Sequence, residues 1–253
     1  MELAAKLASI GNRILAFLAT IMILVMLLYG GYSLWDVYVT YTGAFLGSDL
    51  MQWKPTAGED NAPTFEELRS INPDVKAWIT IDGTHIDYPV LQGEDDMEYV
   101  NKDVYGEFSL SGAIFISAEN DGDFNDKYSL TYGHHMDNGG MYGDVMEMLD
   151  EDYFQKHKTG TLILPDKSYQ IQLYAILETD AYDSMVYNVQ NINSDMSAFQ
   201  SYIRQKAVHY EDIGVTAEDQ VISLTTCKDT STSGRAVAIG KLVPLSANKE
   251  EAK

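Results

Sequence analysis

The chain of 253 residues is acidic, with 17 lysine and arginine residues against 38 aspartate and glutamate residues and a formal net charge of −21. This charge argues against a nucleic-acid-binding protein, because binding to phosphates depends on clusters of basic side chains. A single cysteine excludes a disulfide within the chain, and a hydrophobic fraction of 45% predicts a globular protein held together by its core.

The first feature along the chain is an apolar run at residues 14–35, which contains no charged residue. As a helix, this run is long enough to cross a hydrocarbon core of about 30 Å. Lys6 and Arg13 precede it and acidic residues follow it, so the positive-inside rule predicts a single-pass cell-membrane anchor with residues 1–13 in the cytoplasm and the rest of the chain outside. The length and flanks of the run favour an uncleaved anchor over a cleaved signal peptide.

Residues 36–63 are predicted to join this anchor to an outer domain. Apolar residues at helical spacing extend the helix beyond the membrane, and a breaker-rich stretch at 55–63 forms a linker. We expect one outer domain at 64–245 and a polar tail at 246–253.

The outer domain begins with a capping box at residues 64–67, which predicts a short helix that starts at Thr64 and ends at Asn72. Two alternating runs then flank Asp82 and Gly83, the pattern of a hairpin with a type I′ turn. This hairpin is predicted to contain the first two strands of the domain.

Further strand and helix patterns follow the hairpin. Strands are predicted at 113–117, 128–134, 161–164, 169–177, 221–226 and 236–243, and helices at 141–150 and 195–209. About eight strands at irregular spacing favour a barrel or a sandwich. The second helix lies in a long connection just before the strand that ends in the cysteine.

That cysteine, Cys227, is a candidate nucleophile. Strand alternation places it on the same face as Ser223 and Thr225, away from the more apolar face, and a polar loop follows it. Arg235 opens the next strand, so two neighbouring strands are predicted to hold a thiol and a guanidinium close together. The simpler alternatives are a buried inert thiol and an edge-strand charge without a partner.

Two adjacent histidines, His134 and His135, end the strand predicted at 128–134. Adjacent strand residues point to opposite faces, so at most one of them can meet Cys227. No metal site is predicted, because zinc needs three or four converging ligands and the acidic loop at 119–123 does not have EF-hand spacing.

The run Ser-Leu-Thr-Thr-Cys227, followed by Arg235 and preceded far upstream by Tyr132-Gly133-His134, resembles the TLxTC, His and Arg signature of sortases, the membrane-anchored cysteine transpeptidases of Gram-positive bacteria. The stretches 68–78 and 86–92 and the helix-bearing connection resemble class B. The resemblance covers residues 65–243 and implies a mainly β fold, a closed eight-stranded barrel with short helices.

By this resemblance, Cys227 is the nucleophile, His134 the acid and base, and Arg235 the group that steadies the substrate carbonyl or the oxyanion. Thr225 and Tyr132 correspond to positions that line the peptide groove. We expect no cofactor.

The resemblance also has departures and alternatives. His135 stands where the family often has asparagine, and Ser223 replaces the usual threonine. Class B relatives imply cleavage of an NPxTN-like sorting signal after its threonine and transfer of the surface protein to a peptidoglycan cross-bridge amine. A pilin polymerase that uses a lysine acceptor, and a non-catalytic membrane-tethered binding module, are the alternatives.

Overall fold

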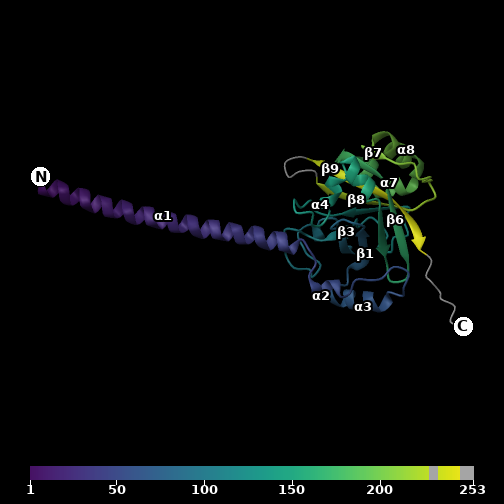
Figure 1. The fold of residues 1–253 in the computed structure, drawn as a ribbon, viewed down its shortest axis with the longest axis horizontal. Helices are drawn as coiled ribbons and strands as arrows, with labels where there is room; N and C mark the ends of the chain where they lie inside the picture. Colours follow the sequence, from purple (N-terminus) through teal and green to yellow (C-terminus); the bar gives the residue numbers. More distant parts are fainter. Residues whose placement is uncertain (228–232, 246–253) are drawn as a thin grey trace. The chain divides into compact units, whose positions relative to one another are not determined.

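The computed structural model describes residues 1–227 and 233–245 and separates into two compact units, Met1–Thr42 and Gly43–Lys253. Helix α1 (Glu2–Gly43) accounts for the first unit (Figure 1). The predicted apolar run and its extension are therefore one continuous helix. By length and composition α1 can cross a membrane, which agrees with a membrane anchor.

In the second unit, the described strands form one sheet in the order β5-β1-β2-β3-β4-β8-β9-β6-β7 (Figure 1). The strands are β1 (Val75–Ile81), β2 (Asp87–Leu91), β3 (Ile114–Ile116), β4 (Tyr128–Tyr132), β5 (Thr159–Ile163), β6 (Ser168–Asp180), β7 (His209–Tyr210), β8 (Val221–Cys227) and β9 (Gly234–Leu245). Pairing of β5 with β6 closes eight of them into a barrel, and the two-residue β7 pairs only with β6. The expected closed eight-stranded barrel is confirmed, and the sandwich alternative is wrong.

Short helices and turns connect the strands. They are α2 (Ser48–Met51), α3 (Ala62–Ile71), the 3₁₀ turn η1 (Glu98–Val100), α4 (Gly143–Glu147), α5 (Glu151–Lys156), α6 (Ser184–Tyr187), α7 (Val189–Ser194) and α8 (Met196–Lys206). In Figure 1, α7 and α8 lie on one side of the barrel, and α2 and α3 on the opposite side. The sequence patterns predicted α3, α4 and α8, but not α2, α5, α6 and α7.

Strand β8 is buried on both faces. Ile222 and Leu224 belong to the apolar cluster inside the barrel, whereas Val221 belongs to a second cluster formed with residues of α6, α7 and α8. The expected alternation is confirmed, but the face that carries Ser223 and Thr225 is also buried, since these two residues are only 0% and 2% exposed. The helical connection covers that face.

Helix α3 begins two residues before the predicted capping box. Asn61 is its N-cap residue, and Pro63 occupies the first turn, where a proline has no backbone N–H to satisfy. The Asn61 side chain pairs with the backbone of Thr56 instead of capping the helix. The predicted end at Asn72 is confirmed.

The predicted hairpin forms, but its turn differs from the expectation. Strands β1 and β2 are antiparallel, and Gly83 has a φ of +75° while Asp82 does not have a positive φ. This combination fits a type II turn and excludes type I′, which needs two positive φ angles. Strand β2 starts later than expected because the Thr84 hydroxyl bonds the backbone of Ile81 and Ile86 and holds residues 84–86 in the loop.

Candidate active site

Cys227 and Arg235 are direct cross-strand partners at the ends of β8 and β9. The two strands pair antiparallel along their whole overlap, from Val221 with Lys241 to this last pair. Cys227 is partly exposed, and Arg235 also lies at the edge of the buried sheet. The structure therefore brings the predicted thiol and guanidinium positions together, while the loop 228–232 lies outside the described residues.

His134 reaches the same edge of the barrel from β4. Strands β4 and β8 run parallel, with Tyr132 opposite Thr225, so their carboxyl ends meet. The Gly133 N–H donates to the Thr225 carbonyl at 3.1 Å and carries the pairing one residue further. His134 follows directly.

The ring of His134 is held on two sides. Its Nε2 lies 2.7 Å from the carbonyl oxygen of Val100. Because a carbonyl oxygen only accepts, Nε2 carries a hydrogen, which leaves Nδ1 as the ring nitrogen that can exchange a proton with another group. A Cβ at Gly112 would lie 3.0 Å from the ring and 2.5 Å from the Val100 carbonyl oxygen, so only glycine fits at this position with a φ of +60°.

All five residues that the sequence predicted for the site line one pocket of about 370 Å³: Cys227, His134, Arg235, Thr225 and Tyr132. Residues that the sequence reasoning missed complete the lining, among them Asp96, Phe115 and Tyr187. The pocket thus combines a thiol, an imidazole and a guanidinium with an aromatic wall.

The aromatic wall is a stack of three rings. Tyr132 stacks on Phe115 with ring centroids 5.1 Å apart and on Tyr187 at 6.5 Å. The Tyr187 hydroxyl lies 2.8 Å from the Thr225 hydroxyl. Burial raises the pKa of Tyr187 to about 12, although the hydrogen bond to Thr225 and the charge of Arg235 oppose this shift. Tyr187 therefore keeps its proton at neutral pH and can donate a hydrogen bond into the pocket.

Asp96 places a carboxylate in the same pocket. Its Oδ1 accepts from the backbone N–H of Ala118 at 2.7 Å, and its Oδ2 accepts from the Ser117 hydroxyl at 3.1 Å. Burial, followed by the negative charge of Asp96, strongly raises the pKa of Tyr132. Asp96 lies in an acidic loop without strand or helix periodicity, so no sequence signal distinguished it from its neighbours.

The surroundings of Arg235 include a second carboxylate. Arg235 donates from Nη1 to the Gly234 carbonyl at 3.0 Å. The hydroxyl of Ser233, then the backbone N–H of Tyr182 and the charge of Arg235, lower the pKa of Asp180. This carboxylate stays ionised and contributes to the field around the guanidinium.

His135 faces a different cavity of about 380 Å³, where it is joined by His85 and Asp144. Its Nε2 lies 3.4 Å from Asp137. The prediction that the two adjacent histidines separate is confirmed, because only His134 lines the pocket with Cys227. Within the described ranges 1–227 and 233–245, no group of three or more His, Cys, Asp or Glu residues is placed to hold a metal ion.

Known proteins are similar to this chain in sequence and in fold. The family model of the sortase domain matches residues 79–243. Sortase B of Staphylococcus aureus is 27% identical over 242 residues, which cover 93% of this chain and 99% of the relative. A class B sortase of Streptococcus pyogenes, involved in pilus biogenesis, is 42% identical with a TM-score of 0.65, covering 70% of this chain and 97% of that one.

A third similar structure contains a substrate. It is a complex of Staphylococcus aureus sortase B, 30% identical with a TM-score of 0.68, and the match covers 73% of this chain and 87% of that one. The family match spans well over half of the chain, and the relatives are class B enzymes. The chain therefore belongs to the sortase family of cysteine transpeptidases, among the class B sortases.

Proposed function

We propose that Cys227 is the nucleophile of this transpeptidase, His134 its acid and base, and Arg235 the group that stabilises the oxyanion. One observation carries the proposal: the cross-strand pair of Cys227 and Arg235 opens into the same pocket as His134. A thiolate is the attacking form of cysteine, and cationic surroundings favour it.

The reaction then has two balanced halves. The Cys227 sulfur bonds to the carbonyl carbon of the substrate, the C–N bond breaks, and His134 gives a proton to the leaving amine. An acceptor amine next attacks the thioester, loses its proton to His134 and releases the thiolate. In both halves the guanidinium of Arg235 faces the negative charge that develops on the carbonyl oxygen.

The proposed donor is an NPxTN-like sorting signal of a secreted surface protein, cleaved after its threonine. The resemblance to class B sortases supports this substrate. The pocket also suits a peptide, because Tyr132, Tyr187 and Thr225 offer apolar ring faces and hydroxyl groups side by side. The proposed acceptor is a peptidoglycan cross-bridge amine, which would join the surface protein to the cell wall.

The experiment for this function is a peptide panel. The full-length protein, purified in detergent, is incubated with several sorting peptides, with and without amine acceptors, beside the Cys227→Ala variant. We expect cleavage after threonine and transfer to the amine by the native protein alone. Equal turnover by Cys227→Ala would contradict the proposed nucleophile.

A second candidate function is polymerisation of pilin, with a pilin lysine as the acceptor. The 42% identity to a class B sortase involved in pilus biogenesis favours it. Mass spectrometry of the product distinguishes the two acceptors, since only pilin polymerisation leaves an isopeptide bond to lysine. A non-catalytic binding module would not form a covalent adduct between Cys227 and a thiol-reactive mimic of the sorting peptide.

We also propose that residues 1–13 are cytoplasmic, 14–35 form the membrane-spanning signal anchor, and 36–63 lead from it to an extracellular catalytic domain at 64–245 with a polar tail at 246–253. From Gly43 onward the leading segment belongs to the same compact unit as that domain. The flanking charges support this orientation. Because Cys227 is the only cysteine, a membrane-impermeant thiol reagent tests this orientation directly. Labelling of intact cells is expected, whereas labelling only after lysis would contradict the orientation.

A further inference from the structure

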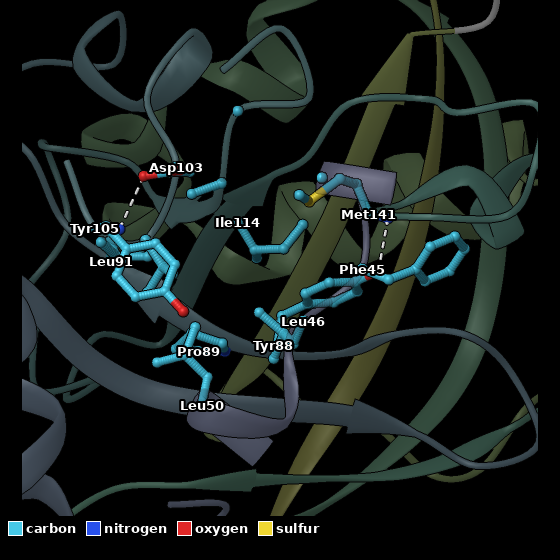
Figure 2. Close-up of a pocket in the computed structure, with 15 residues that line it drawn as sticks. Phe45, Leu46, Leu50, Tyr88, Pro89, Leu91, Asp103, Tyr105, Ile114 and Met141 are labelled. Atoms are coloured by element: carbon cyan, nitrogen blue, oxygen red, sulfur yellow. Dashed lines mark hydrogen bonds between the residues drawn. The ribbon is translucent and has the colours of Figure 1, made fainter. Parts of the chain in front are cut away.

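The segment that directly follows α1 is part of the domain core. Ala44 is fully buried within the apolar cluster of the barrel, and Leu50 is 1% exposed. Figure 2 shows Phe45, Leu46 and Leu50 gathered with Tyr88 around an apolar cavity of about 130 Å³. The catalytic steps proposed above do not use this segment.

The hydroxyl of Tyr88, on β2, joins this segment to another part of the chain. It donates to the carbonyl of Ala44 at 2.9 Å. It also accepts from the backbone N–H of Met141 at 3.0 Å, and a dashed line in Figure 2 marks this second bond. Tyr88 is 3% exposed, and burial raises its pKa to about 12, so the hydroxyl keeps the proton that it donates. One oxygen therefore satisfies two buried backbone groups that are 97 residues apart in the numbering of the chain.

Met141 belongs to the loop that begins with His134. The backbone N–H of Tyr142, the next residue, donates to the His134 carbonyl at 3.0 Å and closes this loop. Met141 has a φ of +54°, which is a costly conformation for a side chain of this size. The hydrogen bond from the Met141 N–H to Tyr88 stabilises that conformation. The next residue, Tyr142, makes the bond that holds the backbone of His134.

A second contact joins the same two segments. A Cβ at Gly140 would lie 2.8 Å from the Ala44 Cβ and 3.3 Å from the Ala44 carbonyl oxygen. The backbone of the loop therefore packs directly on the segment after α1, at a distance that only glycine permits. Packing of Gly140 on Ala44 therefore joins the two segments in addition to the hydrogen bonds of Tyr88.

We propose that Tyr88 is a positioning residue, which uses Ala44 as a fixed support to hold the His134 loop in its active geometry. Tyr88 does not line the site pocket, so it acts through the loop. The proposal rests on the proposed role of His134. By this proposal, the residues directly after the N-terminal helix help to position a catalytic residue.

The Tyr88→Phe variant is the central test, made in the full-length protein in detergent. It leaves the Ala44 carbonyl and the Met141 N–H without their partner, and the loop loosens. We expect kcat to fall about tenfold, because small displacements of a catalytic group are costly. KM for the sorting peptide should stay within about twofold, because Tyr132, Tyr187 and Thr225 lie on β4, α6 and β8 and keep their contacts.

Hydrogen–deuterium exchange provides a readout that does not depend on activity. In Tyr88→Phe, the amides of Met141 and Tyr142 should exchange faster, while those of β8 stay protected. Tyr174→Phe is the matched control, since Tyr174 is also fully buried and its hydroxyl bonds Gln200, away from the loop. The control should change neither kcat nor the exchange of residues 134–142.

A second variant tests the same link if Tyr88→Phe folds poorly. Gly140→Ala forces the loop away from Ala44 and should also lower kcat with little change in KM. An unchanged kcat in a folded Tyr88→Phe protein, or an equal loss in Tyr174→Phe, overturns the positioning role. Failure of the proposed function is a separate result, because it would appear as equal activity of Cys227→Ala and the native protein.

Discussion

Two halves of the site are held in different ways. Cys227 and Arg235 are the last pair of a continuous antiparallel ladder between β8 and β9, which is buried between two apolar clusters. His134 lies beyond the end of β4, on a loop held by Val100, by the backbone of Tyr142 and, through Met141, by Tyr88. The position of Cys227 therefore depends on the sheet, whereas the position of His134 depends on a few specific contacts.

Loss of the thiol should have the largest effect. Cys227→Ala removes the group that forms the thioester, so we expect peptide cleavage to fall by about 1000-fold or more. Cleavage of a sorting peptide, followed by chromatography, measures the loss. A melting temperature equal to that of the native protein would show that the strand ladder is intact.

The two histidines offer the sharpest internal control. His134→Ala should lower kcat by about 100-fold or more, because general acid and base catalysis is lost. His135→Ala should change kcat by less than about threefold, since His135 faces the separate cavity with Asp137 and Asp144. A large loss in His135→Ala and a small one in His134→Ala would reverse the assignment of the two residues.

Variants of Arg235 test the half of the site that β8 and β9 hold. Arg235→Ala should lower kcat by about 100-fold, the effect of removing one strong oxyanion donor. Arg235→Lys should recover only part of this loss, because an ammonium group keeps the charge but not the planar fork of donors. Full activity of both variants would assign oxyanion stabilisation to another group in the pocket.

The smallest effect concerns the end of β8 away from the thiol. Burial opposes ionisation of Asp219, but hydrogen bonds from Lys241 and Thr216 outweigh it and lower its pKa. Asp219 and Lys241 form an ion pair at 2.9 Å beside the pair of Val221 with Lys241. Asp219→Asn should therefore lower the free energy of unfolding by about 1 kcal/mol at pH 7.

The pH dependence of this effect has a definite sign. Because the pKa of Asp219 is lower in the folded protein than its model value of 3.8, its contribution is complete above that value and is lost as the pH falls below it. Denaturant unfolding at pH 7 and pH 3 measures the difference between Asp219→Asn and the native protein. An equal difference at both pH values would show that the carboxylate charge is not its source.

Local sequence patterns predicted much of the sheet. The strands from 113–117 onward appear near their predicted ranges because alternation and turn residues act over a few neighbours. The start of α3 and the turn at Gly83 differ slightly from the predictions. Pro63 allows the helix to begin before the predicted capping box, and the Thr84 hydroxyl holds the residues after Gly83 in the loop. Tyr187 and Asp96 had no local signal, because only folding brings α6 and the acidic loop to the pocket.

The sequence by itself determined that the chain has an apolar N-terminal helix, that Cys227 ends a strand, and that Arg235 lies at the start of the next one. These are local properties, because they depend on hydrophobic length and on a period of two residues. Only the tertiary structure decided that helices cover the second face of β8 and that His135 lines a cavity with His85 and Asp144. It alone joins Ala44, Tyr88 and Met141, since a hydroxyl can pair two distant backbone groups only after the barrel has brought them together.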